Sequence, residues 1–117
     1  MMSQYLVAIY HPNGYDGTLE SEEMAHDIDV LNDEMVAKGV RVFVGGLCSE
    51  KDARSLRKQA NGNVAVTPGL YLGADEHIGG FWVIEAASLD EALDWGRKAV
   101  LACHAPVEIR PFIRAED

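Results

Sequence analysis

The sequence predicts one α+β domain, on the basis of three observations. The length of 117 residues suits one domain of ordinary size. A composition of 48% hydrophobic and 25% charged residues is typical of a globular chain that buries a core. Apolar β-prone runs and two helical patterns follow the order β-α-β-(hairpin)-β-α-β. This is the ferredoxin-like split βαβ pattern, in which two helices cover one face of an antiparallel sheet.

Residues 4–10 form the first predicted strand, an apolar run that ends in a turn-rich segment at residues 11–17. A helix follows. Ser21 can serve as its N-cap, and Gly39 can end it in the left-handed conformation. Its inner face is an apolar stripe at steps of four, three and four residues, formed by Met24, Ile28, Leu31 and Met35.

The middle of the chain predicts a second strand and an inserted hairpin. Residues 40–44 form the strand, which runs into a glycine pair. The hairpin consists of a weak strand at residues 55–57, an Asn61-Gly62 turn and a strand at residues 63–67. Residues 68–78 are predicted to form a loop.

The last third of the chain predicts a strand, a helix and an edge strand. Residues 81–86 are strongly β-prone, and Ser88 with Glu91 makes a capping box that opens the helix. Residues 107–112 form the final strand, and Pro111 favours an edge position. The inner side of the helix carries Ala92, Trp95, Ala99 and Cys103, and both tryptophans, Trp82 and Trp95, are predicted to lie in the core.

The predicted strands are apolar on both faces. In the first strand, alternate side chains point in opposite directions, and both sets are apolar: Tyr5, Val7 and Ile9 against Leu6, Ala8 and Tyr10. Residues 81–84 repeat this pattern. Two helices cover only one face, and a monomer tolerates an exposed apolar patch of only about a few hundred Å². We therefore expect a symmetric homodimer that packs sheet against sheet.

Charge and cysteine content argue against several classes of function. Nineteen acidic and ten basic side chains give a net charge of −9, which repels nucleic acids and anionic lipids. No run approaches the roughly 20 apolar residues of a membrane span, and the first residues lack the pattern of a signal peptide. We expect a cytoplasmic protein with reduced thiols at Cys48 and Cys103, Cys103 on a helix face.

Cofactor and metal motifs are missing from the sequence. We find no phosphate-cradling loop and no dinucleotide fingerprint, so no cofactor is predicted. Asp75, Glu76 and His77 are adjacent and cannot easily converge on one ion, so no metal site is predicted.

Two histidines are the candidate acid–base residues. His11 follows the first strand, and we expect it at the rim that holds the start of the first helix and Glu85. We expect His77 at the opposite rim. The alternative for His11 is an ordinary loop histidine. His26 lies about 200° from Met24 around the helix, so it is predicted to face solvent.

Glycines and a tyrosine complete the pocket that we expect around His77. Glycine permits close approach of a ligand, and tyrosine offers a ring and a hydroxyl, although the glycines could equally be turns into strands. The candidate ligand-binding residues at that rim are Gly45, Gly46, Tyr71 and Gly80.

Three segments carry a resemblance to a known family. They are Gly79-Gly80-Phe81-Trp82-Val83-Ile84, the run from Ser88 to Trp95, and Val107-Glu108-Ile109-Arg110-Pro111-Phe112. These residues resemble the YCII-related family, especially its DGPF branch, and the likeness spans nearly the whole chain. The resemblance implies a ferredoxin-like protein that forms a dimeric α/β barrel, with a biochemical role that is largely undefined.

Two positions depart from the pattern of that family. The Asp-Gly-Pro-Phe motif corresponds to Pro68-Gly69-Leu70-Tyr71, which keeps only Gly69. The histidine that the resemblance places on the first helix falls on Ile28, whereas its aspartate partner could correspond to Asp52. We carry Asp52 and Gly69, with Tyr10 at the end of the first strand, as candidate ligand-binding residues. The two departures lower the expectation of inherited enzyme activity.

Three functions stay open at this point. The first is binding of a small molecule between sheet and helices. The second is a cofactor-independent lyase or isomerase that uses His11 or His77 as general acid or base. The third is an interaction module whose dimer surface is its function.

Overall fold

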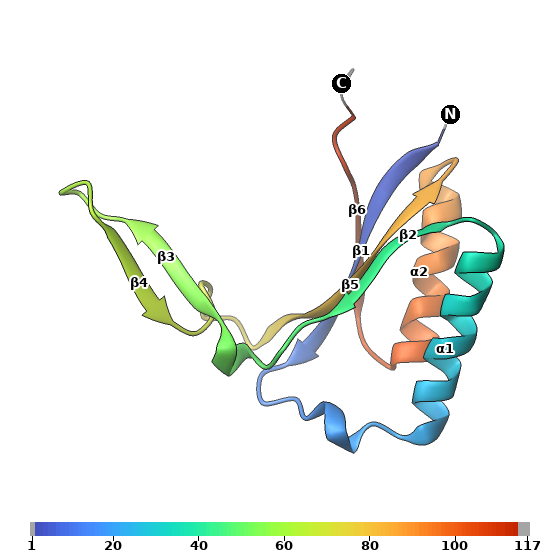
Figure 1. Ribbon diagram of the computed structural model, residues 1–117, viewed down its shortest axis with the longest axis horizontal. Coiled ribbons are helices and arrows are strands. Elements are labelled where there is room, and N and C mark those ends of the chain that lie inside the picture. The colour runs from blue at the N-terminus through green and yellow to red at the C-terminus, as the bar shows by residue number, and fades with distance from the viewer. Residues whose placement is uncertain (1, 115–117) are drawn as a thin grey trace.

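A four-stranded antiparallel sheet carries both helices on one side, and a two-stranded hairpin projects on the other side (Figure 1). The computed structural model describes residues 2–114. The main sheet has the spatial order β2-β5-β1-β6 and is built from β1 (Ser3–Pro12), β2 (Arg41–Gly46), β5 (Glu76–Ala86) and β6 (Val107–Pro111). The other elements are α1 (Glu22–Ala37), α2 (Leu89–Cys103), the hairpin strands β3 (Arg54–Lys58) and β4 (Val64–Pro68), and the 3-10 turns η1 (Gly17–Leu19) and η2 (Glu50–Asp52). The predicted α+β class is confirmed, and the element order is consistent with a ferredoxin-like fold.

Local capping residues set the helix ends as predicted. Ser21 Oγ accepts a hydrogen bond from the Met24 N–H at 3.1 Å at the start of α1. Gly39 follows the end of α1 with a φ of +67°, a conformation that favours glycine. At α2, Ser88 Oγ accepts from the Glu91 N–H at 3.2 Å. Neither helix in the described part of the chain has the length and apolarity that a membrane crossing requires.

The core lies between the helices and the sheet face that they cover. Buried side chains from β1 and β5 pack against buried side chains of the helices. Trp82 and Trp95 are both buried, as predicted, and Trp82 Nε1 donates to Asn32 Oδ1 at 2.9 Å. The core residues are Tyr5, Val7, Ile9, Leu31, Met35, Val40, Trp82, Ile84, Ala86, Ala92, Trp95, Ala99, Ala102 and Cys103.

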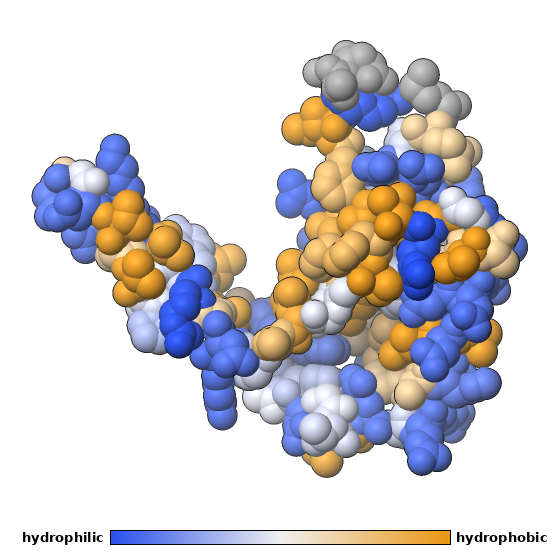
Figure 2. All heavy atoms as spheres, in the orientation of Figure 1, coloured by the Kyte–Doolittle hydropathy of each residue, from blue (hydrophilic) through white to orange (hydrophobic). Residues whose placement is uncertain are grey.

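The other face of the main sheet is apolar and carries no helix. Register places Leu6 opposite Val83 and Ala8 opposite Phe81, and the rings of Phe43 and Phe81 lie tilted against each other with centroids 5.7 Å apart. Phe43 is 53% exposed. We call this surface, formed by Leu6, Phe43, Phe81 and Val83, the open face; Ala8 lies on the same side of the sheet but is buried. Figure 2 shows apolar surface over the strands and on the hairpin.

Two strands extend beyond their predicted ends. β5 begins at Glu76 rather than at residue 81, and β1 continues to Pro12, because Glu76–Ile78 pairs in the ladder with Tyr10–Pro12. The predicted loop at residues 68–78 is therefore too long. A register shift between Ile9 and Tyr10 leaves Gly79 without an opposite residue, and this bulge lets the ladder continue past the two glycines. At the other end of the chain, the last strand stops at Pro111 rather than at residue 112.

Candidate functional site

The end of β1 and the start of β5 form one rim of the main sheet. The two strands are antiparallel, and His11 lies directly opposite His77 in the ladder. The prediction that placed the two histidines at opposite rims is wrong. Glu85, predicted to lie beside His11, pairs instead with Gln4 at the far end of the strands. Strand direction explains the error, because the end of one antiparallel strand meets the start of its neighbour.

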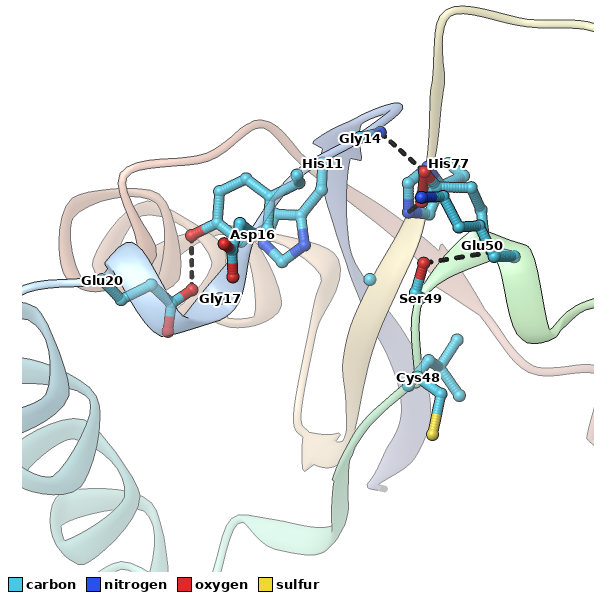
Figure 3. Close-up of a pocket in the computed structure, with 13 residues that line it drawn as sticks. His11, Gly14, Asp16, Gly17, Glu20, Cys48, Ser49, Glu50 and His77 are labelled. Atoms are coloured by element: carbon cyan, nitrogen blue, oxygen red, sulfur yellow. Dashed lines mark hydrogen bonds and ion pairs between the residues drawn. The ribbon is translucent and has the colours of Figure 1, made fainter.

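A hollow of about 460 Å³ opens at this rim (Figure 3). Three segments surround it: the end of β1 with the turn that follows, the segment between β2 and β3, and the start of β5. Its polar lining includes His11, Tyr15, Asp16, Glu20, Cys48, Ser49, Glu50, Lys51 and His77.

His77 is held between two hydrogen-bond acceptors. Its Nδ1 lies 2.9 Å from Asn13 Oδ1, and Asn13 Nδ2 donates to the Ala74 carbonyl at 2.8 Å. The Ala74 contact orients the amide so that Oδ1 faces the ring, and Nδ1 therefore carries a hydrogen. The Nε2 atom of His77 lies 3.3 Å from Glu50 Oε2. The neutral ring donates only to Asn13, whereas the imidazolium donates to both partners, so the His77–Glu50 pair can take up and release one proton.

Glu50 is positioned by the turn that follows β1. Its Oε1 accepts a hydrogen bond from the Gly14 N–H at 2.6 Å. This bond, the backbone N–H of Glu50 itself and the charge of His77 hold the pKa of the carboxyl below its usual range. Its Oε2 is buried and accepts no hydrogen bond within residues 2–114. Glu50 therefore presents an ionised oxygen to His77 at the wall of the hollow.

His11 lies against backbone on one side and an aromatic ring on the other. The rings of His11 and Tyr15 stack with centroids 3.8 Å apart. A Cβ atom at Gly79 would lie 2.1 Å from His11 Nδ1, so only glycine leaves room for this ring position. Burial lowers the pKa of His11, opposed by the nearby Glu20 and assisted by His77. Its imidazole is therefore neutral near pH 7 and can accept a proton.

Tyr15 and Glu20 form a hydrogen-bonded pair beside His11. The Tyr15 hydroxyl donates to Glu20 Oε2. Burial and this bond raise the pKa of Tyr15 to about 12, which keeps the phenol protonated. Tyr15 therefore serves as a ring support for His11 and not as a base.

A smaller apolar hollow of about 160 Å³ adjoins the first. The two hollows share His11, Glu20 and Gly79, and the second continues between the sheet and the start of α1. Its lining includes Ile9, Met24, Ile28, Val44, Gly45, Gly46, Gly80, Phe81, Trp82 and Cys103. Ile28, where the family resemblance places a histidine, thus borders the same hollow as His11.

The predicted ligand-binding residues divide into two groups. Gly45, Gly46 and Gly80 line the apolar hollow. Gly80 is also required for the close packing of β2 and β5, because a Cβ atom at this position would lie 3.0 Å from the Gly45 carbonyl oxygen. The remaining four, Tyr10, Asp52, Gly69 and Tyr71, line neither hollow.

These four residues have other contacts, and that of Asp52 is a hydrogen bond from its N–H to the Ser49 carbonyl at 2.9 Å. Tyr10 OH donates to Glu108 at 3.2 Å, and the Gly69 N–H donates to the Ala53 carbonyl at 2.8 Å at the base of the hairpin. Tyr71 is 62% exposed and lies 5.7 Å from the Arg57 guanidinium. Its predicted place beside His77 is wrong, because Tyr71 lies beside Arg57 of the hairpin and lines neither hollow.

Sequence reasoning missed Asn13, Tyr15 and Glu50. Asn13 and Tyr15 were interpreted only as turn residues, and the acidic partner was sought at Asp52, two positions past Glu50. One local signal was available, since Ser49 can cap the short turn that contains Glu50, and Ser49 Oγ does accept from the Lys51 N–H at 3.2 Å.

The two cysteines differ in environment. Burial raises the pKa of Cys103 to about 11, so its thiol is protonated at neutral pH. Cys48 is exposed and lies at the mouth of the larger hollow. Among residues 2–114, no group of three or more His, Cys, Asp or Glu side chains is arranged to hold a metal ion.

Comparison with known proteins agrees with the resemblance noted in the sequence. Residues 2–115 match the YCII-related domain. An uncharacterized protein of Rhizobium meliloti (strain 1021) is 35% identical over 78 residues, which are 67% of this chain and 62% of that protein. The matched part thus spans less than two thirds of the relative's length. The domain match covers almost the whole sequence, and the chain therefore belongs to the YCII-related family.

Proposed function

We propose that this protein binds a small polar molecule in the hollow between β1, β5 and η2 and exchanges protons with it. One observation carries the proposal: three separate segments bring His11, His77 and Glu50 to the wall of one cavity of about 460 Å³. Cavities of this size suit small metabolites, and titratable groups that converge in one are a recognised mark of acid–base sites.

The two histidines have different roles in this proposal. His11 is neutral because burial lowers its pKa, so it accepts a proton from the ligand. When His77 is protonated, its Nε2–H can donate to Glu50 Oε2, 3.3 Å away, and the ring can then return this proton to the ligand. A proton removed at one atom and replaced at another is an isomerisation, and removal with loss of a protonated leaving group is an elimination by a lyase.

The adjoining hollow narrows the class of ligand. A ligand whose polar part lies beside His11 can place a small apolar group between Met24, Ile28 and Trp82. Asp16, Glu20 and Glu50 outnumber Lys51 in the larger hollow, which disfavours multiply charged anions. We therefore propose a neutral or cationic small molecule with a short apolar substituent.

The NMR signals of the histidine imidazole rings test the binding site directly. In a titration with a library of small polar fragments, ring signals of His11 and His77 should shift, and those of His26 and His104 should stay constant. The latter pair are internal controls, because both rings are exposed and neither lines a hollow. Fragments that bind but move only His26 or His104, or no histidine, would contradict the proposal.

Substitution tests the chemistry once a ligand that turns over is found. His11→Gln and Glu50→Gln should each lower kcat by about 10²-fold or more, the usual contribution of a positioned acid or base. His26→Gln serves as the control with unchanged kcat. Full activity in both pocket variants would leave binding without acid–base catalysis.

We also propose that two copies pair through the open face. Leu6, Phe81 and Val83 are only partly buried, and Phe43 is 53% exposed, so this apolar surface lacks a cover within the described chain. A second copy supplies a cover of matching chemistry, in agreement with the dimeric barrel that the family resemblance implies.

Sedimentation equilibrium tests this pairing. The wild-type particle should have twice the 12.8 kDa chain mass at micromolar concentration. Val83→Lys should raise the dimer Kd about 100-fold, because a charge is then buried in an apolar interface. Val30→Lys, on the exposed surface of α1, is the matched control. A monomeric wild type would overturn the proposal.

A further inference from the structure

The β3–β4 hairpin stands apart from the rest of the molecule. Figure 1 shows it projecting away from the main sheet on the side opposite the helices. The radius of gyration is 16.4 Å, whereas a compact chain of this length would have about 13 Å. A two-stranded hairpin that packs on nothing is only marginally stable in water. A second surface packed against the hairpin would therefore stabilise it.

One face of the hairpin is apolar. Leu56 pairs with Val66 and Lys58 with Val64, so strand alternation places these side chains on one face. Leu56, Val64 and Val66 are between 57% and 62% exposed. We call this face the arm face, and it consists of Arg54, Leu56, Lys58, Val64, Val66 and Pro68. The opposite face carries Ser55, Arg57, Ala65 and Thr67.

The hairpin also differs in charge from the remainder of the chain. Residues 53–74 contain three basic and no acidic side chains, so the whole-chain charge of −9 leaves −12 for the other residues. Two of the three cations, Arg54 and Lys58, flank the apolar strip of the arm face. An acidic surface with apolar side chains is complementary to this face. The open face has this character, because its apolar side chains are bordered by two acidic residues, Glu85 opposite Gln4 and Glu108 opposite Ala8, and by one basic residue, Arg110 opposite Leu6.

We infer that the arm face packs against a second copy of this chain, so that each copy in the dimer is held by the hairpin of the other. The inference rests on the sheet-to-sheet dimer proposed above. The hairpin projects on the same side as the open face, so a copy seated on that face lies within its reach (Figure 1). In each copy, the residues outside 53–74 carry a net negative charge, which is complementary to Arg54 and Lys58 on the arm face of the other copy.

Neighbouring residues on opposite faces of the hairpin give a matched test. Val66→Asp and Lys58→Glu change the arm face and should each raise the dimer Kd by about tenfold or more, since an apolar contact or an ion pair is lost. Thr67→Asp and Arg57→Glu introduce the same charges on the opposite face and should leave Kd within about threefold. Sedimentation velocity over a concentration series measures all four against wild type.

Removal of the arm gives a second test that does not depend on one side chain. The Gly69 N–H donates to the Ala53 carbonyl at 2.8 Å, so an Asn-Gly turn can replace residues 54–68 and close the base. The shortened chain should keep its fold, as judged by circular dichroism. Its dimer Kd should rise by about tenfold or more, as in the arm-face variants.

Three results would overturn the inference. The first is an unchanged Kd in Val66→Asp, Lys58→Glu and the shortened chain, which leaves the sheet-face dimer intact. The second is equal weakening by both members of each matched pair. The third is binding to phosphatidylserine vesicles that only arm-face variants lose, with Kd unchanged, which would assign the face to a lipid surface. A monomeric wild type would remove the sheet-face dimer and this inference together.

Discussion

Gly79 is the residue on which the position of His11 depends most closely. The His11 ring occupies the space that any larger residue at position 79 would need for its Cβ atom. The same ring stacks on Tyr15, which Glu20 holds through its hydroxyl. Packing against Gly79 and Tyr15 thus positions the His11 ring, and a larger residue at position 79 should displace it.

Gly79→Ala should displace the His11 ring and cost about 1–3 kcal/mol of stability, the usual range for overpacking. Gly73→Ala is the control, because a Cβ there would meet no atom within 4 Å. Urea denaturation measures the stability of both variants, and the NMR chemical shift of the His11 imidazole shows whether the ring has moved. An unshifted His11 resonance in Gly79→Ala would show that the site tolerates the extra methyl group.

His11 also predicts a pH dependence of stability. Burial lowers its pKa in the folded state below the unfolded value of about 6.5. Between these two values the unfolded chain binds more protons, so stability is full above about pH 6.5 and declines as pH falls through the folded pKa. His11→Gln should decline less than wild type between about pH 6.5 and pH 5. His26→Gln should follow the wild-type curve, and equal curves for all three proteins would contradict the assigned cause.

Helix α1 shows how one element divides its residues between core and solvent. Met35 is fully buried, and the next residue, Val36, is 55% exposed. Met24 and Leu31 continue the buried stripe, whereas His26 faces solvent. The helix also supplies Met24 and Ile28 to the apolar hollow, so the first turns of α1 contribute to both core and site.

Met35→Ala should cost about 2–5 kcal/mol, because it leaves a cavity in a packed core. Val36→Ala should change stability by less than about 0.5 kcal/mol. Guanidinium unfolding followed by circular dichroism at pH 7 compares the two. A similar loss for both would mean that α1 is rotated about its axis relative to the described packing.

The whole molecule combines a packed body with a projecting arm of opposite charge. Its principal extents are 50, 43 and 18 Å, and the hairpin accounts for much of the spread (Figure 1). A segment with few buried apolar contacts opens at lower free energy than the central strands.

Hydrogen exchange should therefore separate arm from body. In the Val83→Lys monomer, amides of residues 54–68 should exchange faster than those of β1 and β5. In the wild-type dimer, the same hairpin amides should be slowed, because a second copy covers them. Mass spectrometry of peptic peptides measures both, and slow exchange of the hairpin in the monomer would show that it is stable alone.

Much of the fold follows from short-range chemistry in the sequence. Ser21, Gly39 and Ser88 set helix ends through contacts with residues at most four positions away, and the α1 stripe follows from helical periodicity. Strand alternation likewise predicts the two apolar faces of the main sheet. The exact start of β5 escaped prediction, because pairing with β1 overrides the turn preference of Gly79 and Gly80.

The sequence by itself determined the elements, the buried faces and two of the three principal residues of the pocket. The tertiary structure alone decided that His11 and His77 share a rim, that Glu50 rather than Asp52 is the acidic partner, and that Tyr71 lies elsewhere. These facts depend on strand direction and register between segments far apart in the chain. Local propensity and periodicity carry no information about which distant residues meet.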